Sequence, residues 1–333
     1  MKKRGKGIAC IFYGTGYGNG FPDVSRAIAQ LQKDGNIAIY VGATEVGQGA
    51  KTIMLQMAAE VLGIQVKDII LSCEDTSITP DSGTAAASRQ TYNTGNAVKI
   101  AVEKLKKELF EIAAKKLGLN STVGLETRDK RIYVKSYPER FITFKELASS
   151  IKQNIKKEGI FIAQTTKMDD ETGQGAPYWP YTVAACSVEV EVDTETGKVE
   201  VLRSVFAQDV GKAVNPKLIE GQIDGGFSMG LGYALMEDLK LKNGEIKNNS
   251  FTNYLIPTSM DMPEIEKVII EEPESTAPFG AKGIGEPVTI PVAPAILNAI
   301  YNAVGVRMTE IPVTPDRLLK ALKEKNLGAI SNE

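Results

Sequence analysis

Residues 187–202 decide the fold and read Ser-Val-Glu-Val-Glu-Val-Asp-Thr-Glu-Thr-Gly-Lys-Val-Glu-Val-Leu. Val188, Val190 and Val192 alternate with polar residues, and this period of two is typical of a β-strand with one buried face. Turn-forming residues follow, and Val199 and Val201 resume the alternation. The segment therefore predicts a β-hairpin.

A glycine-rich helix is expected after this hairpin, because Asn215 and Pro216 are typical of an N-cap and a first helical position. The helix contains five glycines: Gly221, Gly225, Gly226, Gly230 and Gly232. Each glycine weakens a helix by about 1 kcal/mol relative to alanine. Close packing against a neighbour is therefore expected.

The most apolar run lies farther downstream, from Val288 to Val306. It contains Pro291 and Pro294 and two asparagines, which are unfavourable in the middle of a lipid bilayer. The run therefore predicts a buried helix rather than a membrane span.

A similar order of strands and helices precedes the hairpin. The expected elements are a strand at 8–12, a hairpin at 27–41, helices at 50–61 and 98–112, strands at 69–73 and 131–134, and a helix at 144–155. Strand-then-helix order occurring twice predicts an α+β fold of two similar two-layer α/β subdomains. The polar segment 165–181, rich in Gly and Pro, places the boundary so that the subdomains are residues 1–170 and 171–333.

Composition excludes several classes of function. The 333 residues carry a formal net charge of −2, which gives no electrostatic reason to expect nucleic acid or an anionic membrane as a partner. Histidine is absent, so catalytic Ser-His-Asp and Cys-His groups and HExxH metal sites are excluded. Residues 5–13 do not resemble a signal peptide.

The cysteines suggest neither a metal centre nor a disulfide framework. Cys10, Cys73 and Cys186 lie far apart, without a CxxC pair that could hold zinc or an iron–sulfur cluster. They are expected to be reduced core residues of an intracellular, cytoplasmic protein.

The glycine run at residues 14–20 follows a predicted strand, as in dinucleotide-binding proteins. Its spacing differs from GxGxxG, and Phe21-Pro22-Asp23 prevents an immediate helix. A nicotinamide dinucleotide site is therefore not expected there.

Three other segments could bind a large polar anion. Gly47-Gln48-Gly49 lies at a helix N-terminus, where free N–H groups and the helix dipole favour phosphate. Residues 81–91 combine hydroxyls with Arg89 and Gln90, and Gln222 on the glycine-rich helix offers an amide. Taken singly, each is also compatible with an ordinary helix cap or turn.

The loop 279–287, Phe-Gly-Ala-Lys-Gly-Ile-Gly-Glu-Pro, holds a single carboxylate, Glu286, beside three glycines. Glycine allows backbone to approach a ligand closely, and Pro287 restricts the conformation of Glu286. Either Glu286 is a positioned functional carboxylate, or it is an acid in the first turn of the next helix.

These segments, taken in order, resemble the molybdenum-binding part of the xanthine dehydrogenase/aldehyde oxidoreductase family of molybdenum hydroxylases. The matching motifs are Gly47-Gln48-Gly49, TAAASRQT at 84–91, the segment 209–222 and GIGEP at 283–287. The resemblance covers nearly the whole chain and corresponds to the C-terminal half of the family's large subunit. Within the family, the chain looks most similar to the medium molybdopterin subunit of the nicotinate dehydrogenase group, in which the large subunit is split.

The resemblance implies molybdopterin cytosine dinucleotide as cofactor, with molybdenum held by the pterin dithiolene and carrying a sulfido or selenido ligand. No side chain is then expected to bind the metal. A larger molybdopterin subunit, an FAD subunit and a [2Fe-2S] subunit are the implied partners. The implied cofactor-binding residues are Gly47, Gln48, Gly49, Ser82, Gly83, Thr84, Ala86, Ser88, Arg89, Gln90, Gln222, Lys282, Gly283 and Gly285.

Glu286 matches the family's catalytic glutamate, which implies a general base in the hydroxylation of a nitrogen heterocycle with oxygen from water. Tyr13 is implied as a substrate-pocket residue, or else it is a strand-end tyrosine without such a contact. The substrate could be nicotinate, a purine such as xanthine, or an aldehyde or carbon monoxide. A non-catalytic assembly subunit is the alternative from another class.

Overall fold

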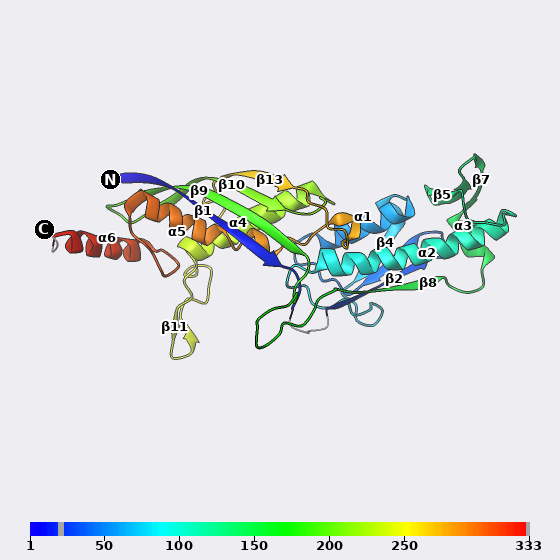
Figure 1. Ribbon diagram of the computed structural model, residues 1–333, viewed down its shortest axis with the longest axis horizontal. Helices are drawn as coiled ribbons and strands as arrows, with labels where there is room; N and C mark the ends of the chain where they lie inside the picture. The colour runs from blue at the N-terminus through cyan, green and yellow to red at the C-terminus, as the bar shows by residue number, and fades with distance from the viewer. Residues whose placement is uncertain (19–22, 331–333) are drawn as a thin grey trace.

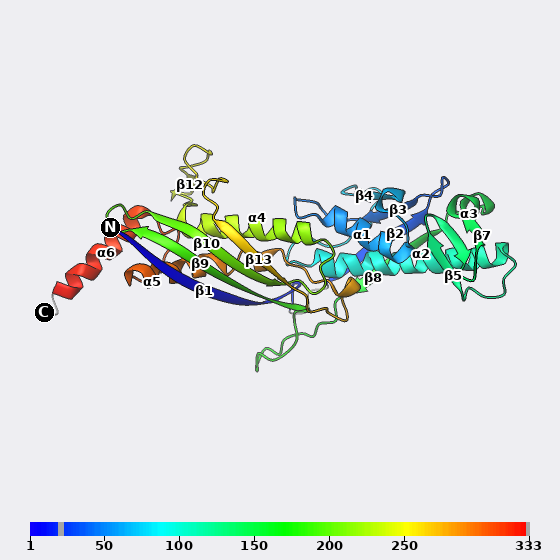
Figure 2. The same cartoon turned by 90° about the horizontal axis from the view of Figure 1, so that it is seen from above.

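The computed structural model describes residues 1–18 and 23–330. Part of the glycine run at 14–20, and Phe21 and Pro22 after it, therefore lie outside the described residues. Two α/β units lie end to end along the long axis of the molecule (Figures 1 and 2). The α+β class and the two-layer units expected from the sequence are confirmed.

One unit is built on a sheet with the strand order β4-β3-β2-β8. Its strands are β2 (Val24–Leu31), β3 (Ile37–Val41), β4 (Ile69–Cys73) and β8 (Lys156–Ile162). The helices α1 (Ala50–Leu62) and α2 (Gly95–Lys116) cover it. Beyond their far end lie a small sheet and a helix: β5 (Leu125–Arg128), β6 (Arg131–Val134), β7 (Tyr137–Thr143) and α3 (Phe144–Ser150).

The other unit contains the sheet β1-β9-β10-β13. Its strands are β1 (Lys2–Gly14), β9 (Tyr181–Asp193), β10 (Val199–Asp209) and β13 (Glu264–Ile270). The helices α4 (Pro216–Leu235) and α5 (Val292–Val304) cover one face, and α6 (Pro315–Ile330) lies at the end of the molecule (Figure 1). Two short strands, β11 (Leu241–Lys242) and β12 (Glu245–Ile246), pair outside this body.

The hairpin that begins the sequence argument forms as expected. Val188, Val190 and Val192 are all buried on the inner face of β9, and β10 returns antiparallel beside it. Asn215 caps α4 by accepting a hydrogen bond from Leu218 N–H at 3.1 Å. Alternation and capping are local features, which explains why the sequence predicts them.

The sheet partner of β1 is a non-local feature, and here the structure departs from the expected division of the chain. β1 pairs antiparallel with β9 along its whole length, from Lys2 opposite Asp193 to Gly14 opposite Tyr181. Gly7 lets β1 lie flush on α5, since an added Cβ would overlap the carbonyl oxygen of Ala295. The division into residues 1–170 and 171–333 does not account for this strand, because it follows sequence order alone.

Two smaller expectations also need correction. α3 ends at Ser150 rather than near residue 155, and Ile155 instead accepts a hydrogen bond from Leu31 N–H at 3.1 Å. Cys186 is buried as expected and Cys73 is half-buried, but Cys10 is exposed. Residues with even numbers in β1 face away from α5, which explains the exposure of Cys10.

The segment Glu286–Val304 is, by length and composition alone, apolar enough to cross a membrane, and half of its apolar window is buried inside the protein. Five of its residues, from Val292 to Ile300, belong to the core between α5 and the sheet. That burial is typical of a core helix.

Candidate active site between the two units

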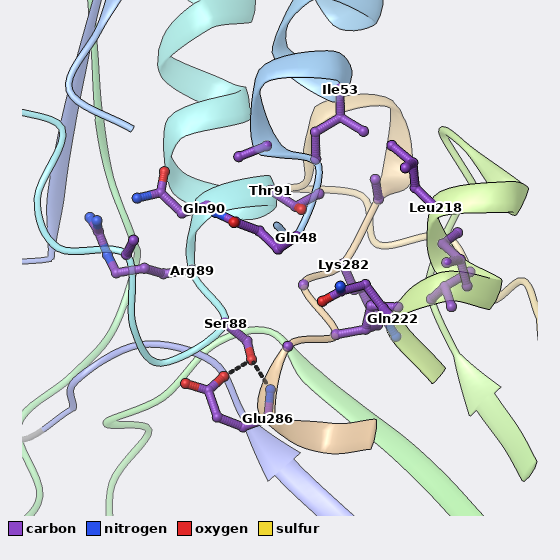
Figure 3. A pocket seen from close by; sticks show the side chains of 18 of the residues that line it. Gln48, Ile53, Ser88, Arg89, Gln90, Thr91, Leu218, Gln222, Lys282 and Glu286 are labelled. Atoms are coloured by element: carbon purple, nitrogen blue, oxygen red, sulfur yellow. Dashed lines mark hydrogen bonds between the residues drawn. The ribbon is translucent and has the colours of Figure 1, made fainter. Parts of the chain in front are cut away.

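A cavity of about 460 Å³ lies where the two units meet (Figure 3). The start of α1 and the loop before α2 form one side, and α4 and the loop before α5 form the other. The expected site residues that line it are Gln48, Ala86, Ser88, Arg89, Gln90, Gln222, Lys282, Gly283, Gly285 and Glu286. Gly47, Gly49, Ser82, Gly83, Thr84 and Tyr13 belong to the surrounding segments and do not line it.

Glu286 begins a short 3-10 helix, Glu286–Val288, and is held by Ser88 from the other unit. The Ser88 hydroxyl donates a hydrogen bond to the Glu286 carboxylate and accepts one from Glu286 N–H at 3.0 Å (Figure 3). Ser88 and Ala87 both adopt left-handed backbone conformations, with φ of 51° and 58°. Such conformations are unfavourable for residues with a side chain and cluster at functional sites.

Gly283 makes this arrangement possible. A Cβ at position 283 would overlap the carbonyl oxygen of Ser88, whereas one at Gly285 would lie 3.3 Å from the Ser88 hydroxyl. The two loops therefore touch through backbone at Gly283, which only glycine permits.

Tyr13, at the end of β1, is the second hydroxyl near Glu286. Burial, followed by the charge of Glu286, raises the pKa of Tyr13 to about 12, while a hydrogen bond with Ser88 acts in the opposite direction. The phenol is therefore protonated near neutral pH and can donate a hydrogen bond.

The charges around the cavity are mostly neutralised within the chain. Lys282 Nζ lies 2.7 Å from the Asp209 carboxylate, with both side chains nearly buried, and Lys212 pairs with Glu271 at 2.8 Å. Among the described residues no cation pairs with Glu286. Of the charged described side chains that line the cavity, only the Glu286 carboxylate is held by hydroxyl groups and not by an opposite charge. It therefore remains available for proton transfer.

Arg89 requires a correction, because the sequence suggested that its guanidinium would bind an anion. The side chain is 1% exposed, and its five N–H donors are all used inside the protein. They reach the Asp23 carboxylate, the carbonyl oxygens of Val24, Ser82 and Thr84, and the Ser25 hydroxyl. Arg89 therefore holds the loop in shape and has no donor left for a ligand.

The start of α1 requires a second correction. Its N–H groups were expected to bind phosphate, but the Glu45 carboxylate accepts hydrogen bonds from Gly47, Gly49 and Lys51 N–H at 2.8–3.1 Å. Burial favours a higher pKa for Glu45, but these bonds outweigh it and the pKa is lowered. Gln48 likewise bonds its own loop, through Val46 N–H and the Thr44 carbonyl oxygen.

Other groups are free to bind a polar cofactor. Within the described residues, no acceptor faces the main-chain N–H groups of residues 84–88 or of Gly283, Ile284 and Gly285. The side-chain amide of Gln222 also has no hydrogen-bond partner among residues 1–18 and 23–330. Residues of both loops line one cavity, and donors without an internal acceptor fit a large polar group with anionic oxygens.

The described residues contain no group of three or more His, Cys, Asp or Glu side chains that could hold a metal ion.

Glu45, Asp23 and Asp209 are the supporting residues that the sequence analysis missed. Glu45 had a readable signal, because it is an acid four residues before the Gly49 N-cap of α1. Asp23 and Asp209 lie 66 and 73 residues from the cations they pair with, and no local pattern marks them.

Comparison with known proteins identifies the family. Residues 1–263 match the family described as Molybdopterin cofactor-binding domain. The chain is 35% identical over 323 residues to the putative xanthine dehydrogenase molybdenum-binding subunit XdhA of Escherichia coli K12, covering 95% of this chain and 42% of that protein. It is 34% identical over 328 residues to the aldehyde oxidoreductase of Megalodesulfovibrio gigas, covering 96% and 32%.

Solved structures show the same fold. The aldehyde oxidoreductase from Desulfovibrio gigas aligns with a TM-score of 0.81 and 33% identity, covering 97% of this chain and 33% of that chain. Quinoline 2-oxidoreductase from Pseudomonas putida 86 aligns with a TM-score of 0.83 at 22% identity, covering 97% and 42%, and shares the fold. The chain thus spans less than half the length of the curated relatives it matches.

Proposed function

This chain belongs to the molybdenum hydroxylase family of xanthine dehydrogenases and aldehyde oxidoreductases, through its molybdopterin cofactor-binding domain, and we propose that it supplies the general base of such an enzyme. The observation that carries the proposal is the Glu286 carboxylate, held at the cavity wall by Ser88 and without a cation partner among the described residues.

The cofactor proposed for the cavity is molybdopterin cytosine dinucleotide. The free N–H groups of residues 84–88 and 283–285 and the Gln222 amide would hold its polar groups, while Arg89, Lys282 and Glu45 keep the walls in shape. When bound, the molybdenum cofactor supplies oxygen transfer to the substrate, with the oxygen drawn from water, and accepts two electrons.

With the cofactor bound, Glu286 would accept the proton lost by the water-derived oxygen during hydroxylation of an electron-poor carbon. Its carboxylate oxygen then carries that proton and can donate it to a ring nitrogen that gains negative charge. Tyr13, whose pKa is raised to about 12 chiefly by burial, is protonated near neutral pH and can donate a hydrogen bond to Glu286 or to the substrate. Ser88 fixes the direction of the carboxylate.

The proposed substrate is a nitrogen heterocycle of the nicotinate type. A purine is the second candidate, because a relative named for xanthine dehydrogenase is 35% identical over nearly the whole chain. A relative named 6-hydroxypseudooxynicotine dehydrogenase complex subunit gamma, from Paenarthrobacter nicotinovorans, is 29% identical and supports heterocycle chemistry.

The proposed partners are a larger molybdopterin subunit, an FAD subunit and a [2Fe-2S] subunit that carries the electrons away. The proposed location is the cytoplasm, where three unpaired cysteines are chemically stable. A purely structural role in assembly does not require a carboxylate at the cavity wall.

The test is oxidation of a substrate panel by the complex purified from its native host. Nicotinate, xanthine, hypoxanthine and an aromatic aldehyde are offered in ¹⁸O-labelled water, and the products are analysed by mass spectrometry. Heavy oxygen in a hydroxylated heterocycle is expected. Exclusive oxidation of the aldehyde would overturn the proposed substrate class, and inertness toward all four substrates in a molybdenum-loaded complex would overturn the proposed catalytic role.

A further inference from the structure

Residues 236–262 form an arm that projects beyond the C-terminal end of α4, from the unit that contains the β1-β9-β10-β13 sheet (Figures 1 and 2). The arm is held together by polar groups. Asn248, which is nearly buried, accepts a hydrogen bond from Lys240 N–H at 2.9 Å and donates one to the Asp238 carbonyl oxygen at 2.7 Å. Tyr254 donates to Glu237 at 2.7 Å. The arm therefore has a defined shape without an apolar core of its own.

Its apolar side chains point outward instead. Phe251 is 83% exposed and Met260 is 90% exposed. The other exposed apolar residues of the arm are Leu239, Leu241, Ile246, Leu255 and Ile256. So many large apolar side chains on one short projection are unusual for a free surface and typical of an interface.

The exposed face of α4 continues this surface toward the cavity. Met229 and Tyr233, spaced by one helical turn, are both about half exposed, and Met229 also lines the cavity. Gly221 and Gly225 precede them at the same spacing, and an added Cβ at either would meet nothing within 4 Å. Gly226 and Gly230, by contrast, are packed against Val288 and Val292.

We propose that the α4 face and the arm together form the docking surface for the polypeptide that corresponds to the rest of the relatives' molybdenum-binding subunit. A Cβ at position 221 or 225 would meet none of the described residues within 4 Å, so these glycines leave the helix backbone open to that polypeptide. The inference rests on the family assignment and on the proposed larger molybdopterin partner.

Two observations favour this polypeptide as the partner: the greater length of the relatives' chains, and the position of the surface beside the cavity. This chain covers 42% of the quinoline 2-oxidoreductase chain and 33% of the aldehyde oxidoreductase chain. More than half of each of those polypeptides therefore has no counterpart in this chain. The surface also ends at the cavity, where Met229 and Gln222 stand at its border. A polypeptide docked there would complete the cavity wall.

The test is site-specific photo-crosslinking in the intact complex, with benzoylphenylalanine in place of Met229, Phe251 or Met260. The control positions are Val123 and Tyr137, which are exposed residues of the unit built on the β4-β3-β2-β8 sheet. Mass spectrometry of the crosslinked peptides should identify a sequence that aligns with the part of the relatives' subunit that has no counterpart in this chain. The control positions should give no such crosslink. Crosslinks to a second copy of this chain, to a flavin or iron–sulfur subunit, or to no protein would overturn the proposal.

Matched substitutions give a second readout that does not depend on activity. Phe251→Glu and Gly225→Leu should leave the melting temperature of the full chain within a few degrees and reduce copurification of the partner polypeptide at least tenfold. Tyr137→Glu, the control, should leave copurification unchanged. Unchanged copurification of both test variants would refute the docking surface, even where the complex still hydroxylates its substrate.

Discussion

Ser88 combines an unfavourable backbone conformation with the hydrogen bonds that hold Glu286, so two substitutions separate its roles. Ser88→Ala removes the hydroxyl and keeps the strained φ, whereas Ser88→Gly removes the hydroxyl and relieves the strain. Both variants should lower kcat about tenfold, or about 1.4 kcal/mol, which is the scale of one hydrogen bond to a charged group. Ser88→Gly should also be the more stable of the two on urea unfolding. A wild-type kcat for Ser88→Ala with normal molybdenum content would contradict this role.

Arg89, the residue after Ser88, has a structural role. Arg89→Ala leaves the buried Asp23 carboxylate without its cation, and breaking such a pair commonly costs about 3–5 kcal/mol. Urea unfolding of the single variant should show a loss of that size. The double variant Asp23→Asn, Arg89→Met removes both charges and should recover part of the loss. Equal stability of wild type and Arg89→Ala would contradict the structural role.

The sequence could predict which loops form the site but not the task of each residue. Glycines and hydroxyls at 47–49, 82–90 and 283–286 do come together around one cavity. Arg89 seemed suited to bind an anion because its partner, Asp23, is distant in sequence, and local reasoning could not reveal the pairing of Lys282 with Asp209 either.

At the scale of elements, the start of α1 depends on Glu45. Glu45→Gln weakens three hydrogen bonds to the helix N-terminus and removes the favourable charge, so a loss of about 1–2 kcal/mol is expected at pH 7. Because the pKa of Glu45 is lowered from 4.5 in the folded protein, its stabilising contribution is present above about pH 4.5 and fades as the pH falls through the folded value.

The pH dependence provides the control for that prediction. Thermal unfolding of wild type and Glu45→Gln should differ at pH 7 and converge as the pH falls below 4.5 and through the lowered pKa of Glu45 in the folded protein. A difference between the two proteins that stays constant from pH 7 to pH 3 would show that the carboxylate charge does not support the helix.

The elements that follow from local patterns were predictable, and their long-range pairing was not. The β9–β10 hairpin, α1 and α2 have clear alternation or helical periodicity. The pairing of β1 with β9 joins segments nearly 180 residues apart, and the parallel contact of β10 with β13 crosses a helix and the arm. Neither pairing leaves a signal within a window of sequence.

At the scale of the whole molecule, the two units meet beside the cavity, and their closest backbone approach there is between Gly283 and Ser88. Gly283→Ala should push these loops apart and lower the molybdenum content of the purified complex several-fold, with little change in its secondary structure by circular dichroism. Gly285→Ala is a graded comparison, because its Cβ would lie 3.3 Å from the Ser88 hydroxyl and needs only a small shift, so it should lose less molybdenum than Gly283→Ala. Equal loading of both variants would indicate that the contact between the loops does not shape the cofactor site.

The central claim concerns Glu286, and its most direct test is Glu286→Gln in the complete complex. Glutamine keeps the size of the side chain and most of its hydrogen bonding but cannot accept the proton. Molybdenum, flavin and iron–sulfur content should therefore stay normal, and dithionite should still reduce the chromophores. Anaerobic mixing with nicotinate or a purine should reduce them about 10²–10⁴-fold more slowly than in wild type. Substrate-driven reduction at the wild-type rate would contradict the assignment of Glu286 as the general base.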